Sequence, residues 1–225
     1  LQRTVVIRAY LNGQTLRQIG EDLNTPLGTI KSALSRALVR LRGASLTRGG
    51  VTLVDGLDFE LMPGARWAVL GENGAGKTTL LRLVRGDAPP DLGGERLYAL
   101  PGPGGEPGEP QPSPLGLRQR LALVSSDMQD LYGVNDWAAT GLEVVLAGFL
   151  DAPLLYGQPT PEQRAGAGAV LAELGLQALA ARRMARLSTG EGRKILLARA
   201  LAVRPDVLLL DECLEGLDAP SRAEF

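Results

Sequence analysis

Apolar residues near the start of the chain recur at helical spacing. One run is separated by four, four and three residues: Ile30, Leu34, Leu38 and Leu41. This spacing puts one apolar stripe on a helix, and Thr25 followed by Pro26 suits the helix start. Two shorter helices are expected upstream, the second opened by a capping box of Thr15 and Gln18. Residues 1–43 are therefore predicted to form a helix-turn-helix module.

After Gly43 the pattern changes to alternating apolar and polar residues. Apolar positions across residues 51–61 predict strands of a half-buried sheet. Residues 67–70 are expected to form a short buried strand, and a glycine-rich loop and an amphipathic helix over residues 77–85 follow it. Residues 101–114 hold six Pro and four Gly, which predicts a solvated loop within one domain.

The second half of the chain alternates predicted strands with predicted helices. Strands are expected at residues 121–124 and 207–210, and helices between residues 143 and 185. The clearest helix start combines a capping box with a proline at the first helical position: Thr160, Pro161 and Gln163. Alternation of this kind predicts an α/β sheet.

The glycine-rich loop fits the pattern G-x-x-x-x-G-K-[ST] between a predicted strand and a predicted helix. The candidate nucleotide-binding residues are this motif and the residue after it: Gly71, Glu72, Asn73, Gly74, Ala75, Gly76, Lys77, Thr78 and Thr79. Glycines let backbone N–H groups turn toward a phosphate, and the helix start adds its positive end. Lys77 would reach the β- and γ-phosphates, and the Thr78 hydroxyl would bind Mg²⁺. The alternative is a glycine-rich turn without a ligand.

Two acidic residues follow the strand expected at residues 207–210. Asp211 can supply the anionic ligand that a nucleotide-bound Mg²⁺ requires. Glu212 can act as general base on an attacking water, a role that contributes a factor of about 10² to 10⁴. The alternative is an exposed acidic strand end without a catalytic role.

Composition limits the chemistry further. The 225 residues contain no His and one Cys, which excludes a histidine base, an intrachain disulfide and a zinc site within them. Since no apolar run approaches the roughly 18 residues of a membrane span, a cytosolic chain is the default interpretation. Because the sequence lacks a starting Met, it is expected to begin inside a longer reading frame or after processing.

A third motif indicates a family. Leu187-Ser-Thr-Gly-Glu-Gly192 and the segment after it resemble the signature sequence of ABC ATPases, and Glu215-Gly-Leu-Asp218 resembles their D-loop. The resemblance covers residues 44–225 and implies a P-loop NTPase sheet with a helical subdomain. It also implies signature contacts to ATP held by a second nucleotide-binding domain, through Ser188, Thr189, Gly190 and Glu191. For the signature segment alone, a capped helix start without a ligand is the alternative.

The same resemblance implies hydrolysis of ATP with Mg²⁺ by a dimer, as the ATP-binding subunit of a transporter with a transmembrane partner. It implies a location in the cytoplasm, peripheral at the inner face of the membrane. The chain departs from the family in three places. Thr47-Arg-Gly-Gly50 lacks the usual adenine-stacking aromatic residue, although Arg48 can stack instead; Gln129 is displaced from the Gln-loop position; and Cys213 replaces a Pro. Since the sequence ends before the switch histidine, the domain is expected to be truncated at its C-terminus.

The first 43 residues resemble region 4 of extracytoplasmic-function sigma factors, chiefly in Thr25-Pro-Leu-Gly-Thr-Ile-Lys-Ser32. Seven basic and two acidic residues give this segment a net charge of +5, whereas the whole chain carries -1. The resemblance implies promoter DNA and RNA polymerase as partners. The candidate DNA contacts are Thr29, Lys31, Ser32, Ser35 and Arg36. The alternative is a basic three-helix bundle that contacts proteins.

Three hypotheses remain open: an ABC-type ATPase, a DNA-binding transcription module, and a fusion of two partial frames with neither activity complete. Because most of the chain is ABC-like, ATP binding and hydrolysis is the main prediction. The preferred nucleotide base and any transported substrate are left open.

Overall fold

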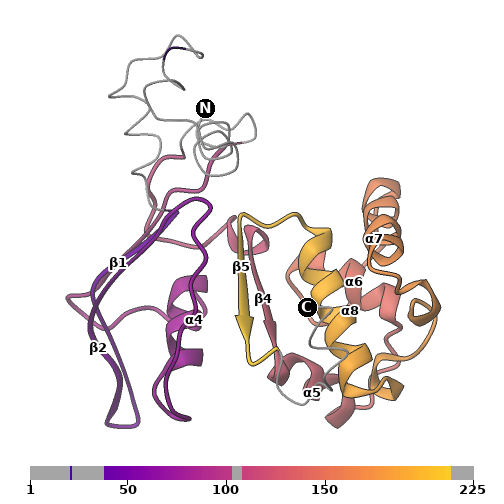
Figure 1. The fold of residues 1–225 in the computed structure, drawn as a ribbon, viewed down its shortest axis with the longest axis horizontal. Coiled ribbons are helices and arrows are strands. Elements are labelled where there is room, and N and C mark those ends of the chain that lie inside the picture. The colour runs from indigo at the N-terminus through magenta and orange to yellow at the C-terminus, as the bar shows by residue number, and fades with distance from the viewer. Residues whose placement is uncertain (1–20, 22–37, 103–107, 214–225) are drawn as a thin grey trace. The chain divides into compact units, whose positions relative to one another are not determined.

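A computed structural model of the chain describes residues 21, 38–102 and 108–213. The chain divides into two compact units, residues 1–115 and residues 116–225, and each is described by itself. Figure 1 shows the elements in chain order from indigo to yellow. Some predictions concern residues outside the described ranges: the upstream helices, Thr29, Lys31, Ser32, Ser35, Arg36 and the D-loop residue Asp218.

The first unit contains a three-stranded antiparallel sheet in the order β2-β1-β3. Its strands are β1 (Val39–Arg48), β2 (Val51–Leu61) and β3 (Glu95–Tyr98). Val39 pairs with Leu61 on one side and with Tyr98 on the other, so β1 is the central strand. The strands predicted across residues 51–61 form one continuous strand, β2.

The prediction of a helix that runs to Leu41 is wrong, because β1 begins at Val39. Val39 and Leu41 are two residues apart, as are Ala44 and Leu46, and all four are buried. The register to β2 shifts between Leu41 and Ala44 and again between Ala44 and Leu46. This period of two suits a strand, which forms a ladder with β2 along its length and with β3 over Val39–Arg42. Leu38 and Leu41 are also three residues apart, so the same apolar residues fit a helical spacing.

The helix predicted over residues 77–85 is confirmed as α4 (Lys77–Arg85), which packs against β1 and β2. Its last turn buries Leu83 and Val84. The buried Arg96 of β3 joins this turn to the sheet, because its Nη1 donates to the carbonyl of Leu83 at 2.9 Å and to that of Ala88 at 2.6 Å. The helix that follows the glycine-rich loop is therefore anchored at its far end.

The prediction of a buried strand at residues 67–70 is wrong. The segment has no strand partner among the described residues, and Trp67 and Leu70 are 63% and 89% exposed. The Trp67 ring instead meets Phe59 edge-on, with ring centroids 5.5 Å apart. A buried strand needs neighbours that a local apolar run does not specify.

The proline-rich loop is confirmed where the structure describes it. In residues 101–102 and 108–114 the only ladder contact is a bridge between Gln111 and Tyr98. The end of the loop packs against Gly86, where an added Cβ would lie 2.5 Å from the ring of Pro114. Gly86 also has a φ of +89°, so both its conformation and its surroundings require glycine.

The second unit combines a two-stranded parallel sheet with helices. Its strands are β4 (Leu121–Ser125) and β5 (Val207–Asp211), which confirm the strands predicted at these places. Its α-helices are α5 (Ser126–Val134), α6 (Gly141–Ala147), α7 (Pro161–Glu173) and α8 (Thr189–Ala202). Short 3-10 turns are η2 (Arg118–Arg120), η3 (Gly148–Leu150), η4 (Gln177–Leu179) and η5 (Met184–Arg186). The α/β class is confirmed.

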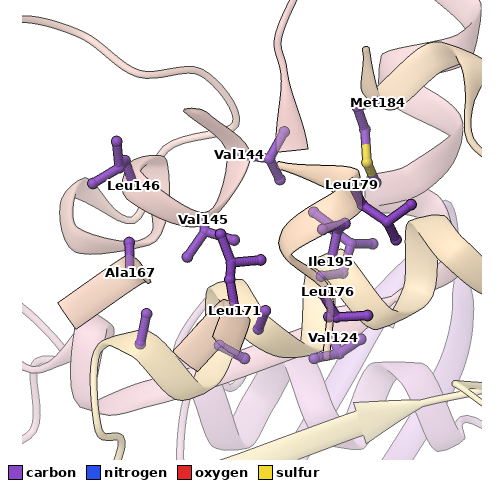
Figure 2. Packing of buried hydrophobic residues seen from close by; sticks show 14 of the residues in the cluster. Val124, Val144, Val145, Leu146, Ala167, Leu171, Leu176, Leu179, Met184 and Ile195 are labelled. Carbon is purple, nitrogen blue, oxygen red and sulfur yellow. The ribbon is translucent and has the colours of Figure 1, made fainter. Parts of the chain in front are cut away.

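The core of this unit lies where α6, α7 and α8 meet, as Figure 2 shows. Fully or almost fully buried side chains include Val144, Val145, Leu171 and Ile195, and Val124 of β4 joins the same cluster. Each such side chain contributes about 1.5–3 kcal/mol by leaving water. Within the described ranges, no helix is long and apolar enough to cross a membrane.

Three of these helices begin with the same device. In α6, α7 and α8 a hydroxyl accepts a hydrogen bond from the third helical N–H, and the third side chain accepts one back, with Thr140, Thr160 and Ser188 as the caps. The predicted cap at Thr160 and Gln163 is confirmed. These reciprocal bonds satisfy backbone groups that a helix start leaves open.

Candidate nucleotide-binding site

The phosphate loop Gly71–Gly76 turns directly into α4. Gly74 and Gly76 have φ angles of +86° and +89°, in a backbone region that residues other than glycine rarely adopt. An added Cβ at Gly76 would lie 2.7 Å from the carbonyl oxygen of Leu53, so β2 approaches the loop too closely for any larger residue. Backbone conformation therefore favours glycine at both positions, and at Gly76 the approach of β2 requires it.

Lys77 reaches back over this loop. Its Nζ donates to the carbonyl oxygens of Gly71 and Glu72, at 3.0 and 2.9 Å. Thr78 and Thr79 follow in the first turn of α4 and are half-buried. The loop residues from Gly71 to Ala75 are exposed, so an anion can approach the loop from solvent.

The start of α4 differs from those of α6, α7 and α8. Its N-cap is Gly76, no side chain caps it, and its first turn has no acidic residue. Uncapped N–H groups and the positive end of the helix favour an anion at this place. Together with the cation of Lys77, the arrangement can bind a phosphate group.

The acidic strand end lies in the second unit. Asp211 is the last residue of β5, is 9% exposed and pairs in register with Ser125. Glu212 is exposed and has a φ of +51°, which is uncommon for a residue other than glycine. Burial raises the pKa of the Cys213 thiol after it, so this thiol stays protonated at neutral pH. That agrees with a packing role for Cys213.

The signature segment is the start of α8. Ser188 caps the helix, and its Oγ accepts from the Glu191 N–H at 3.3 Å while a Glu191 carboxylate oxygen accepts from the Ser188 N–H at 2.9 Å. Arg182 donates to the same carboxylate at 2.6 Å. The Ser188 N–H is the main cause of the lowered pKa of Glu191, and Arg182 adds to it. Thr189 is exposed and Gly190 is half-buried, so the segment is a capped helix start with an accessible end.

Two departures from the family pattern can now be placed. Arg48 donates to the carbonyl of Thr47 at 3.0 Å. Gln129 lies on α5 against Gly192 of α8, where an added Cβ would be 2.5 Å from its Nε2. The Gln129 Oε1 is buried and has no hydrogen-bond partner among the described residues.

The phosphate loop belongs to the first unit, and the acidic strand end and the signature belong to the second. Within the second unit, the structure brings the signature helix to Glu212 through Arg193, whose Nη1 donates to the Glu212 carbonyl oxygen. Sequence analysis missed this residue. The sequence does hold a signal for it: Arg193 precedes Leu196 by three residues and Ala200 by seven, which places it on the buried face of α8.

Comparison with known proteins gives two family matches. Residues 54–215 match the ABC transporter family, and residues 1–43 match region 4 of Sigma-70. A putative ABC transporter ATP-binding protein of Streptomyces coelicolor is 39% identical over 184 residues, which are 81% of this chain and 60% of that relative. The chain thus spans less than two thirds of this relative's length.

Solved structures share the fold. An inward-facing putative metal-chelate type ABC transporter is 26% identical with a TM-score of 0.62, covering 84% of this chain and 64% of that one. The dimeric post-hydrolysis state of the ATP-binding cassette MJ0796, bound to ADP and Pi, is 20% identical with a TM-score of 0.62, covering 83% and 78%.

The glycine cradle, Lys77 and the uncapped helix define a P-loop protein of the α/β class. Since the family match extends over most of its residues, the chain belongs to the ABC transporter family. Both resemblances in the sequence, to ABC ATPases and to sigma region 4, are confirmed by these matches.

Proposed function

We propose that this chain binds ATP at the phosphate loop and hydrolyses it as one half of a pair of nucleotide-binding domains. The observation that carries the proposal is the start of α4, where glycine cradle, Lys77 and uncapped N–H groups converge. A triphosphate there would exchange its hydration for oriented donors and a cation.

Asp211 and Glu212 have separate roles in this proposal. The Thr78 hydroxyl and the Asp211 carboxylate are each an oxygen donor of the kind that Mg²⁺ prefers, and the proposal assigns both to the ion that accompanies ATP. When bound, Mg²⁺ neutralises charge on the phosphates. Glu212 accepts a proton from the attacking water, a role that suits its exposed position at the strand end.

The signature residues act on a second nucleotide. Ser188, Thr189, Gly190 and Glu191 form the accessible start of α8, and there they contact ATP bound to the partner domain. The dimeric cassette bound to ADP and Pi, which shares the fold, supports the pairing. One relative named as a putative ABC transporter ATP-binding protein and another named as a cobalt import ATP-binding protein support a transmembrane partner, and with it a cytoplasmic location at the inner membrane face.

Binding is tested by titrating the full chain with a fluorescent ATP analogue and Mg²⁺. Lys77→Ala is expected to weaken binding about 10- to 100-fold or more, because a hydrogen bond to a charged group contributes about 1.5–3 kcal/mol. Arg164→Ala removes an exposed cation from α7 and is the matched control. Equal affinity of the Lys77→Ala variant and the parent chain would refute the proposal.

Turnover is tested with Glu212→Gln. The variant is expected to bind the analogue normally and to lose a factor of about 10² or more in ATP hydrolysis, since it cannot accept a proton. Unchanged hydrolysis would remove Glu212 as the base and leave nucleotide binding intact.

The match of residues 1–43 to Sigma-70 region 4 favours a second candidate function, DNA binding. These residues carry a net charge of +5, which suits phosphate contacts. Arg36→Ala and added salt should each weaken binding to a promoter duplex in a fluorescence anisotropy titration. If neither Arg36→Ala nor added salt changes the affinity for the duplex, DNA binding is excluded as a function. The inference of RNA polymerase as a partner would then fail with it.

A further inference from the structure

The turn that carries Glu212 has an uncommon backbone. Glu212 follows β5 directly, and its φ of +51° lies in the left-handed region. A residue with a side chain stays in this region only where the surrounding structure holds it there. The Glu212 side chain is exposed, and the φ of this residue fixes the direction in which its Cα–Cβ bond leaves the backbone.

One contact from α8 bears on this turn. Arg193 is the fifth residue of α8 and only 7% exposed, and its Nη1 donates to the carbonyl oxygen of Glu212. The two residues are 19 apart in sequence, so the contact is tertiary rather than local. The Nε of Arg193 is also buried and has no hydrogen-bond partner among the described residues. A buried guanidinium is rare unless its polar groups are paired, so the hydrogen bond to the Glu212 carbonyl offsets part of the cost of burying Arg193.

We propose that Arg193 is a positioning residue for Glu212. By holding the carbonyl oxygen, it keeps the left-handed turn in place and so directs the carboxylate toward the attacking water. This inference rests on the proposed function, in which Glu212 is the general base. In this inference Arg193 acts through the turn and is not itself a catalytic residue.

The same helix offers a matched control. Arg199 is 5% exposed, and its Nη2 donates to the carbonyl oxygen of Ala152 at 2.8 Å. Arg199 and Arg193 are thus both buried arginines of α8 that bind a backbone carbonyl. Replacing either with Met, which is apolar and similar in length, removes a buried guanidinium and its bond to a backbone carbonyl. For Arg193 that carbonyl belongs to Glu212, and for Arg199 it belongs to Ala152.

The experiment measures kcat and KM for ATP, together with thermal unfolding, for the full chain and its variants. Arg193→Met is expected to lower kcat about tenfold, which is about 1.4 kcal/mol of barrier, and to leave KM within about twofold. Arg199→Met is expected to keep kcat within about twofold at a temperature where both variants are folded. Arg193→Lys keeps a donor and should recover part of the kcat.

A second background separates positioning from folding. Combined with Glu212→Gln, Arg193→Met should cause no further loss of kcat, because a carboxylate that is absent cannot be misdirected. A further tenfold loss there, an equal fall in kcat for Arg193→Met and Arg199→Met, or unchanged kcat in Arg193→Met would overturn the inference. Should Arg193→Met not fold, the same comparison is made with Arg193→Lys, whose shorter reach predicts a smaller loss that also vanishes with Glu212→Gln.

These outcomes also separate the inference from the proposed function. If Glu212→Gln hydrolyses ATP normally, the role of Glu212 as base fails. If Glu212→Gln is inactive while Arg193→Met is fully active, the proposed function stands and only the positioning role of Arg193 fails.

Discussion

Ser188 has two roles that a pair of variants can separate: it caps α8, and in the proposed function it contacts ATP of the partner domain. Ser188→Ala removes the Oγ that accepts from the Glu191 N–H at 3.3 Å, but the bond from the Ser188 N–H to the Glu191 carboxylate remains. Thr160→Ala removes the equivalent bond from the Gln163 N–H at 3.2 Å, and its reciprocal bond also remains. The two caps are therefore matched in geometry.

Loss of an N-cap hydroxyl costs about 1 kcal/mol. In a chain of 225 residues that lowers the unfolding midpoint by about 2–4 °C. Both variants should show this shift when helix content is followed by circular dichroism. Hydrolysis should differ: Ser188→Ala also removes a hydrogen bond to a charged phosphate, about 1.5–3 kcal/mol, and should lose about 10- to 100-fold in kcat/KM.

Thr160→Ala should hydrolyse ATP like the parent chain at a temperature below both transitions. Ser188→Thr keeps a hydroxyl and should retain both the midpoint and most of the activity. The reasoning is refuted if Thr160→Ala and Ser188→Ala lose equal activity, because the loss would then follow from helix capping alone. It is also refuted if Ser188→Ala is fully active.

Two further predictions concern stability. Gly168→Ala in α7 should raise the free energy of unfolding by about 0.5–1 kcal/mol, since an added Cβ there meets nothing within 4 Å. Gly141→Ala should lower it by about 1–3 kcal/mol, because its Cβ would lie 2.5 Å from the Leu179 carbonyl oxygen. Denaturant titration measures both free energies, and a change of the same sign in the two variants would contradict the packing. Glu191→Gln should destabilise the chain at neutral pH but not in acid. The folded pKa of Glu191 is below its usual 4.5, so its contribution is complete above that value and is lost as the pH falls through the lowered pKa; a difference between variant and parent that does not change with pH would exclude the charge as its cause.

Local signals in the sequence were sufficient for the phosphate loop, the cap at Thr160 and the strands β4 and β5. The phosphate loop and the cap depend on neighbours within a few residues, so spacing and residue type specify them. The two strands pair with each other across the chain, and only their positions were predicted from local apolar runs. Arg193 could not be found this way, because its contact joins α8 to a turn 19 residues later. Residues 67–70 failed for the same reason, since an apolar run does not state which strands, if any, will flank it.

The end of the Sigma-70 region 4 match shows how tertiary structure decides between two acceptable local patterns. Residues 39–43 end the match to Sigma-70 region 4 and also form the first half of β1. A helix there would give up ladder hydrogen bonds to both β2 and β3 and would lift Val39 and Leu41, each 0% exposed, out of the sheet. Full burial of two such side chains contributes about 3–6 kcal/mol, while helix and strand propensities differ by only about 1 kcal/mol per residue. The strand forms because the burial and the ladder hydrogen bonds that β2 and β3 provide outweigh the local preference for a helix. Residues that the sequence assigned to the first module therefore complete the sheet against which α4 packs.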